Sequence, residues 1–345
     1  MARIALDAMG GDFAPRAPIA GALHALAELD EVHVVQLVGR RQLIEKELTD
    51  LLAGELANHE NVRDRILLVD APDTISMTDK PTTALRSGSN NPMAVGLKLQ
   101  VEDESDAFVS AGNTGAQMAA SALLLGRLTG VTRPAIATVF PTARQPVVVL
   151  DSGANVDCSP QELVQFAWLG SVYAEYVLGR DRPAIGLLSI GEEKEKGNAT
   201  TKAAFPLFQT AGFNFHGNVE GRDLPAGSSD GVPIDVVVCD GFVGNVVLKF
   251  YEAVMPMIVS LLTDVPSFDK AVLEAALGPL DSTSYGGAPL LGVRGVSIIC
   301  HGNSSPRAIK NAVKVAVRAV ETRMNEHIEE RLTNAASSLS SGQVA

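Results

Sequence analysis

The chain has 345 residues, of which 46% are hydrophobic and only 5% aromatic, so it can bury the aliphatic core of one large α/β domain or two smaller ones. A formal net charge of −12 argues against broad binding of nucleic acid. Cys158, Cys239 and Cys300 cannot all pair and form no CxxC motif, which indicates a reducing, cytoplasmic setting. Asp7 interrupts the first apolar run and no charge-free stretch of 18 residues is apolar throughout, so we expect neither a signal peptide nor a membrane span.

The N-terminal third predicts strands and helices in alternation. A turn, AMGGDFAP at residues 8–15, follows the first strand, and Asp7 either orients this turn or is an ordinary turn former. Residues 71–91 include Lys80 and Arg86 and form a loop long enough to be a lid or a substrate arm. The expected strands are residues 3–7, 32–38 and 66–69, and the expected helices are residues 17–29, 40–56 and 92–101.

Residues 106–127, DAFVSAGNTGAQMAASALLLGR, predict a buried strand, a glycine-bracketed turn and a helix. The turn, residues 110–115, ends at a helix N-terminus, where unpaired N–H groups and the helix dipole suit an anion such as phosphate. One such turn is also explained by an ordinary connection capped by Asn113 or Thr114.

Four more apolar strands end in small, polar, glycine-containing turns, and a helical pattern follows each. Parallel sheets place such turns along the carboxyl edge, where open α/β sheets bind ligands. We therefore expect a ligand site where these turns gather on one edge. The four segments begin at Val147 (VVVLDSGANVD), Ile185 (IGLLSIGEE), Ile234 (IDVVVCDGFVGN) and Val296 (VSIICHGNSS).

The turn at residues 191–198, GEEKEKGN, is unusually charged. Lys196 lies at the start of the next helix, where an anion would be held from two sides, although a solvated charge run explains it equally well. Before this turn, residues 134–150 predict a hairpin, and Ser159 begins a helix that extends to about Leu178.

Residues 246–262, VVLKFYEAVMPMIVSLL, predict a helix that is apolar nearly all round and kinked at Pro256. Its continuation to residue 280, with Phe268 and Val272 at helical spacing, extends it into an apolar arm. Such an arm is buried against a second subunit or contacts lipid. The chain then predicts a strand at 296–300, a helix at 304–331 and a flexible tail at 333–345, so that residues 1–332 form a single α/β domain.

The chain lacks GxGxxG, GxxxxGK[ST], GxSxG and HExxH, so dinucleotide, ATP, esterase and zinc-protease sites lack their usual signatures. His301 follows a strand, where a histidine is a structural hydrogen bonder or an acid–base group, and no Ser/His/Asp spacing supports a triad.

Six segments, in order, resemble the motifs of the bacterial phosphate acyltransferase family of phospholipid synthesis, PlsX. The resemblance extends from residue 3 to about residue 330. The segments are DAMGGDFAP from Asp7, VSAGNTGA from Val109, LDSGANVD from Leu150, LLSIGEEKEKGN from Leu187, VVVCDGFVGNVVLK from Val236 and YGGAPLLGVRGVSIICHGNSS from Tyr285.

This resemblance implies transfer of an acyl group from acyl carrier protein to inorganic phosphate. It also implies a doubly wound, mostly parallel α/β fold with Rossmann-like layers, related to phosphotransacetylase and to isocitrate and isopropylmalate dehydrogenases. A homodimer and peripheral membrane association are further implied. We expect no metal and no cofactor.

The chemistry needs no activated nucleophile, because phosphate itself attacks the thioester, so turns that place phosphate and stabilise an oxyanion suffice. In this scheme backbone N–H groups of Gly112, Asn113, Thr114 and Gly115 hold phosphate, Lys196 adds positive charge, and Asn198 or Asn245 donates to the oxyanion. His301 is a reserve acid, since a thiol of pKa about 8.5 leaves readily. The other turns supply the expected substrate-binding residues Asp7, Gly10, Gly11, Asn155, Asp240 and Gly302.

Two other classes stay open on the sequence. A nicotinamide-dependent dehydrogenase of the related fold would need a ribose pocket and usually a divalent metal held by carboxylates, whereas the acids here are scattered over turns. A non-catalytic acyl-binding protein would use the apolar helix but would not need so many polar turns.

Overall fold

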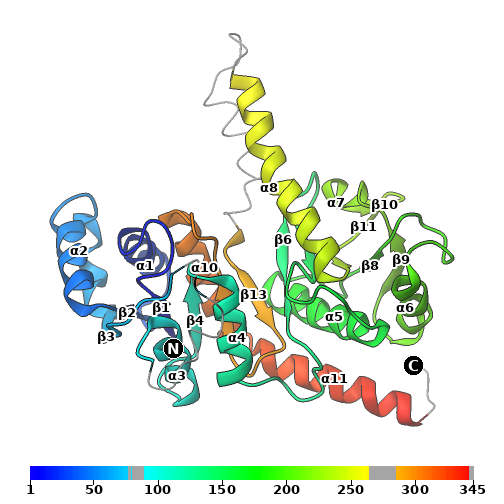
Figure 1. Ribbon diagram of the computed structural model, residues 1–345, viewed down its shortest axis with the longest axis horizontal. Coiled ribbons are helices and arrows are strands. Elements are labelled where there is room, and N and C mark those ends of the chain that lie inside the picture. Colours follow the sequence, from blue (N-terminus) through cyan, green and yellow to red (C-terminus); the bar gives the residue numbers. More distant parts are fainter. Residues whose placement is uncertain (77–78, 80–88, 264–284, 342–345) are drawn as a thin grey trace. The chain divides into compact units, whose positions relative to one another are not determined.

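The computed structural model describes residues 1–76, 79, 89–263 and 285–341 (Figure 1). By its internal contacts the chain forms two compact units. The first unit is Met1–Leu128 with Tyr285–Asn325, and the second is Thr129–Ser284 with Glu326–Ala345. The structure thus divides the single domain expected over residues 1–332. Because the chain leaves the first unit and later returns to it, no shift in composition marks the boundary.

The first unit is built on a sheet with strand order β3-β2-β1-β4-β14-β13. Neighbouring strands are parallel except for β13 and β14, which pair antiparallel. Helix α1 packs closely on α10, since a Cβ added to Gly21 would lie 2.6 Å from Cβ of Ile309. The strands are β1 (Arg3–Asp7), β2 (Val34–Gly39), β3 (Ile66–Asp70), β4 (Ala107–Ser110), β13 (Ala288–Leu291) and β14 (Val296–Ile299). The helices are α1 (Arg16–Glu28), α2 (Arg41–Ala53), the 3-10 helix η1 (Ala57–Arg65), α3 (Pro92–Val101), α4 (Thr114–Leu124) and α10 (Pro306–Glu321).

The second unit has a sheet with strand order β6-β7-β12-β8-β9, in which only β6 and β7 pair antiparallel. This pair confirms the predicted hairpin. The strands are β5 (Ala135–Ile136), β6 (Thr138–Phe140), β7 (Val147–Leu150), β8 (Ile185–Leu188), β9 (Phe215–Val219), β10 (Ser228–Ser229), β11 (Val232–Pro233) and β12 (Val236–Val238). The helices are α5 (Pro160–Val172) with the π-helical turn η3 (Tyr173–Val177), α6 (Ala199–Thr210), α7 (Asp223–Ala226), α8 (Gly241–Thr263) and α11 (Met324–Ser341), which begins at the end of the first unit.

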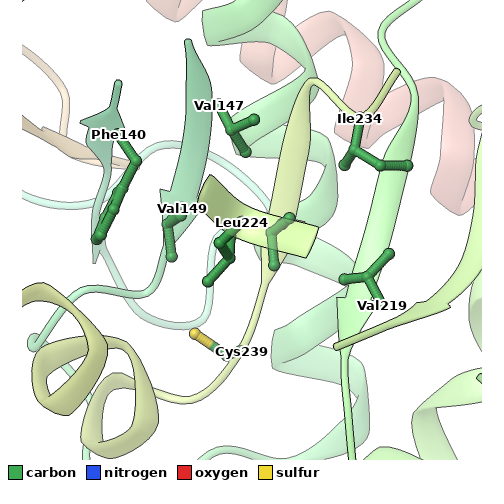
Figure 2. Close-up of a cluster of buried hydrophobic side chains, with 8 residues drawn as sticks. Phe140, Val147, Val149, Val219, Leu224, Ile234 and Cys239 are labelled. Carbon is green, nitrogen blue, oxygen red and sulfur yellow. The ribbon is translucent and has the colours of Figure 1, made fainter. Parts of the chain in front are cut away.

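The core of the second unit is aliphatic, as the composition predicts. Figure 2 shows a cluster in which side chains from the strands of the sheet gather around Leu224 of α7. Val243, Val247, Leu248 and Tyr251 of α8 pack against this cluster, and the Tyr251 hydroxyl donates to the carbonyl oxygen of Pro141. One side of α8 is therefore anchored. The buried members of the cluster are Phe140, Val147, Val149, Val219, Leu224, Ile234, Val237 and Cys239.

Three expectations about elements are wrong. The polar turns do not share one edge of one sheet, because the strands belong to two sheets. Helix α8 begins at Gly241 rather than at Val246, so most of the expected turn at residues 240–245 is helical. Near the C-terminus two helices, α10 and α11, replace one, and α11 continues to Ser341 through most of the expected flexible tail.

Helix α8 continues through position 256 to Thr263. In Figure 1 its C-terminal half extends beyond the strands of its own unit. The predicted continuation with Phe268 and Val272 lies outside the described residues, as do Lys80 and Arg86 of the predicted lid. No helix in the described part of the chain combines the length and the hydrophobicity that a membrane span requires.

Candidate active site

In the first unit, three polar turns meet at the carboxyl ends of the adjacent strands β1, β4 and β14. The N–H of Asp12 donates to the carbonyl oxygen of Gly302 at 2.7 Å, which joins the β1 turn to the β14 turn. Gly11 has φ +97°, and a Cβ there would lie 2.8 Å from the same oxygen. A Cβ on Gly10 would lie 2.8 Å from the backbone nitrogen of Gly112. These positions accept only glycine because the three turns approach so closely.

Asp7 lies beneath these turns and is 3% exposed. Its Oδ2 accepts from the Ser110 hydroxyl at 2.7 Å and its Oδ1 accepts from the N–H of Met9 at 2.9 Å. Burial raises the pKa of this carboxyl above its ordinary value, and the hydrogen bond from Ser110 opposes the rise. Asp7 therefore orients the turn, which is one of the two roles that the sequence left open for it. Direct contact between Asp7 and a substrate stays a prediction.

Helix α4 begins with the cap that the sequence suggested. Asn113 Oδ1 accepts from the N–H of Ala116 at 2.9 Å, while Asn113 Nδ2 donates to the carbonyl oxygen of Asp79 at 3.0 Å. The N–H of Gly112 donates to the Ser110 hydroxyl at 3.0 Å. The N–H groups of Thr114 and Gly115 find no acceptor in the described part of the chain. Of the four amides predicted to hold phosphate, these two are oriented and available.

His301 lies two residues after the end of β14 and is exposed. Its carbonyl oxygen accepts from the N–H of Ser304 at 3.0 Å, which closes the turn that leads into α10. The structure therefore places His301 and Gly302 beside the β1 turn, as the recurring pattern of strand and polar turn predicted.

In the second unit, Asp151 joins the turns that follow β7 and β12. The Asp151 carboxylate is fully buried and accepts five hydrogen bonds of 2.6–3.1 Å, four from backbone N–H groups and one from the Asn155 side chain. Burial raises the pKa of Asp151, and the hydrogen bonds from these donors oppose the rise. Asn155 also donates to the carbonyl oxygen of Pro134 at 2.8 Å, so its side chain is engaged within the fold.

Helix α8 starts directly against this turn. Asp240 accepts from the N–H of Val243 at 2.8 Å, which caps the helix, and a Cβ on Gly244 would lie 1.9 Å from the backbone oxygen of Asp151. Asn245 is exposed, and its Oδ1 lies 3.4 Å from the place of a Cβ on Gly153. The structure thus brings Asn155, Asp240 and Asn245 together.

The charged β8 turn places Lys196 as predicted, one turn before α6. Asn198 caps α6, and its Oδ1 accepts from the N–H of Thr201 at 2.8 Å. The Asn198 side-chain nitrogen has no acceptor among the described residues, and in the same part of the chain the exposed Lys196 makes no ion pair. A cation and an amide donor are therefore both available at this edge, because β8 lies next to β12 in the sheet.

Comparison with known proteins identifies the family. A model described as "Fatty acid synthesis protein" matches residues 2–327. A phosphate acyltransferase of Desulforamulus reducens is 48% identical, and the match covers 97% of this chain and 98% of that protein. The phosphate acyltransferase of Heliobacterium modesticaldum is 46% identical, and the match covers 96% of this chain and 97% of that protein. The chain belongs to the phosphate acyltransferase family. It is therefore an acyltransferase, as the six motifs indicated.

The fold agrees with that of known acyl-transferring enzymes. The EutD phosphotransacetylase from Staphylococcus aureus covers 92% of this chain and 94% of its own, with a TM-score of 0.59 and 14% sequence identity. A branched-chain phosphotransacylase from Enterococcus faecalis has a TM-score of 0.55 and 15% sequence identity, and the match covers 93% of this chain and 99% of that enzyme. At such identities the likeness shows only the fold, and it confirms the expected relation to phosphotransacetylase.

Sequence reasoning missed the turn after β9. Arg222 in this turn lies 2.8 Å from Glu220 and 3.2 Å from Glu192 of the β8 turn, and Asn218 reaches the same β8 turn from the strand. A signal was present, because NVEGRD repeats the pattern of an apolar strand followed by a polar glycine turn. Arg222 and Asn218 therefore join the β9 side of the sheet to the β8 turn.

Proposed function

We propose that the protein transfers a fatty acyl group from the thioester of acyl carrier protein to inorganic phosphate, giving acyl phosphate for phospholipid synthesis. Family membership supports the transfer to phosphate. The thioester donor and the place in phospholipid synthesis come from the family resemblance of the six motifs.

The observation that carries the proposal is the cation at the β8 turn. Lys196 makes no ion pair in the described part of the chain, and the adjacent Asn198 leaves its amide nitrogen without an acceptor. A free cation and a free donor at a helix N-terminus suit a substrate that carries negative charge. In the first unit the backbone N–H groups of Thr114 and Gly115 also lie at a helix N-terminus and have no acceptor among the described residues.

In the proposed reaction a phosphate oxygen attacks the thioester carbonyl carbon and forms a tetrahedral oxyanion. The carbon–sulfur bond then breaks, the electron pair leaves on sulfur, and the products are acyl phosphate and the carrier thiolate. In the second unit Lys196 offsets the charge of phosphate, and Asn198 or Asn245 donates to the oxyanion.

Protonation of the leaving group makes little demand on the enzyme. A thiol of pKa about 8.5 leaves as thiolate near neutral pH and takes its proton from water. His301, exposed at the β14 turn, is the reserve donor for this proton.

We further propose a cytoplasmic homodimer that associates peripherally with the membrane. The side of α8 away from the core exposes a row of large apolar side chains, which supports burial against a second copy. This row consists of Phe242 (62%), Val246 (52%), Phe250 (70%), Met257 (53%) and Leu261 (63%). Membrane contact is assigned to the segment beyond α8, which lies outside the described residues.

The deciding experiment is turnover of acyl carrier protein thioester with and without phosphate. Release of carrier thiol should depend on phosphate and should be matched by acyl phosphate, trapped as the hydroxamate. Equal thiol release in phosphate-free buffer would show that water, rather than phosphate, is the acceptor and would refute the proposal.

A further inference from the structure

The β8 turn that bears Lys196 is fastened to the adjacent strand β9 by one buried side chain. Asn218 is 3% exposed, and its Nδ2 donates to the carbonyl oxygen of Glu193 at 2.9 Å. The same carbonyl oxygen accepts the backbone N–H of Lys196 at 2.9 Å. A single oxygen atom therefore links the buried amide of Asn218 to the backbone of Lys196.

Hydrogen-bonding chemistry fixes the orientation of this amide. The reverse orientation would place the Asn218 carbonyl oxygen against the carbonyl oxygen of Glu193, so that two acceptors would face each other. Asn218 Oδ1 is buried without a partner among the described residues, and so is the hydroxyl of Ser189, the residue that follows β8. Unpaired buried oxygens cost free energy, so the bond to Glu193 is the interaction that holds this side chain in place.

A second side-chain contact with the β8 turn comes from the turn after β9 and is weaker. Arg222 lies 3.2 Å from Glu192, but its side chain is 72% exposed and that of Glu192 is 41% exposed. Exposed ion pairs are screened by solvent and contribute little. Asn218 is therefore the main side-chain attachment of residues 191–198 on this side.

We propose that Asn218 is a positioning residue, which fixes the turn at residues 191–198 and thereby places Lys196. This inference rests on the proposed role of Lys196 toward phosphate. When the bond from Asn218 is lost, the turn should sample more conformations, and Lys196 should spend less time where phosphate needs it. The effect should fall on phosphate and not on the acyl donor.

The test replaces the N–H donor with an oxygen of nearly the same shape, in Asn218→Asp. Asn214→Asp is the matched control, because Asn214 also donates to a backbone carbonyl, that of Arg182 at 3.1 Å, but from the opposite end of β9. Two quantities are measured on the full chain. One is the rate of trypsin cleavage after Lys194 and Lys196, followed by mass spectrometry, and the other is the KM for phosphate in acyl transfer.

We expect Asn218→Asp to accelerate cleavage in the turn about tenfold and to raise the KM for phosphate by a similar factor, with an unchanged KM for the acyl donor. Asn214→Asp should change neither quantity. Asn218→Ala, checked by its melting temperature, replaces the aspartate variant if the buried carboxylate prevents folding.

Cleavage of the Asn218 variant at the wild-type rate would overturn the inference, as would faster cleavage with an unchanged KM for phosphate. Absence of phosphate-dependent turnover in the wild type would instead refute the proposed function. In that case the cleavage rate alone would still decide whether Asn218 fixes the turn.

Discussion

Each of the three thiols lies where the thiolate is disfavoured. Burial raises the pKa of Cys158 and of Cys300 to about 12 and also raises that of Cys239. A thiol with so high a pKa stays protonated at neutral pH and is a poor nucleophile. These values argue against an acyl-cysteine intermediate.

We therefore predict that no acyl group becomes attached to the protein during turnover. Incubation with radiolabelled acyl carrier thioester, with and without phosphate, should leave denatured protein unlabelled, and replacing each cysteine with alanine should keep activity within a few fold. Label recovered on any peptide that contains one of these cysteines would contradict direct attack by phosphate.

Lys196 offers a second test at the scale of one residue. Lys196→Ala should lower turnover by about 10²-fold or more without loss of the folded state, as for one charged stabiliser in a site. Lys194→Ala is the matched control, since Lys194 lies in the same turn and its ammonium group is 3.8 Å from Glu195 at the surface. Similar activities of the two variants, within threefold of wild type, would identify Lys196 as a solvated surface lysine.

The residues that the sequence placed well are those whose role is local. Asn113 and Asn198 cap the helices that directly follow them, so a strand, a turn and a helical pattern suffice to find them. Asp151 and Asn218 act through partners far along the chain, such as Ile136 and Glu193. No local pattern indicates such a partner, and their roles therefore emerged only from the fold.

At the scale of elements, Gly244 marks the closest contact between a helix and a turn. A Cβ at this position would lie 1.9 Å from the backbone oxygen of Asp151, which is not the flexible end of a side chain. Gly244→Ala should therefore push α8 off the β7 turn and destabilise the protein by about 2 kcal/mol, although alanine favours helices. Thermal and urea unfolding measure this change.

The control is Gly221→Ala, because an added Cβ there meets nothing within 4 Å. Its unfolding free energy should stay close to that of wild type. An unchanged or raised melting temperature of Gly244→Ala would show that α8 can shift without cost.

The same glycine explains why the start of α8 was misplaced from sequence. Gly241 and Gly244 are typical of a turn, and β12 ends just before them, so the sequence predicts a helix that begins only at Val246. In the fold both glycines allow the first turn of α8 to approach Asn155 and Asp151. A glycine required by tertiary contact cannot be told from a turn glycine by sequence alone.

Helices α1 and α10 are joined by an ion triplet that makes stability depend on pH. Glu28 lies 2.7 Å from both Lys310 and Lys314, and hydrogen bonds from these lysines lower its pKa from 4.5 to about 2. Because the folded pKa is below the unfolded one, the stabilisation is complete above about pH 4.5 and is lost as the pH falls toward 2.

Glu28→Gln should lower the free energy of unfolding at pH 7 by about 1 kcal/mol at most, since the Glu28 side chain is 43% exposed and screened. The difference from wild type should shrink as the pH falls below 4.5 and as salt is added. Urea unfolding across this pH range measures the difference in unfolding free energy. Glu45→Gln on α2 is the control, because the Glu45 carboxylate lies at the surface and pairs with Arg41 at 3.6 Å. A difference that stays constant down to pH 2 would refute the assignment.

At the scale of the whole molecule, the sequence predicted the class of fold and the family, but not the division of the strands between two sheets. Periodicity identifies each strand and its polar turn, and parallel order follows from the alternation with helices. Membership of a sheet depends on which strands pair, and β4 pairs with β14, which lies nearly 190 residues later. Such long-range pairing leaves no local trace in the sequence.

The exposed row on α8 leads to the prediction for the assembly. Its side chains lie on the side of the helix away from the core cluster, and exposed apolar rows of this length mark interaction surfaces. We predict that the row is buried in a homodimer. Phe250→Glu with Leu261→Glu should therefore lower the mass measured by light scattering from that of a dimer to that of a monomer, because the new charges would be buried without partners.

The matched control is Lys249→Glu, which adds a carboxylate to the same helix at a position that already bears a charge, paired with Glu252 at 2.9 Å. It should stay dimeric. Phe268→Glu with Val272→Glu, beyond the described part of α8, should instead abolish co-sedimentation with phospholipid vesicles while the mass stays that of a dimer. If the α8 variant stays dimeric and loses vesicle binding, the row on α8 contacts lipid and the subunits associate elsewhere.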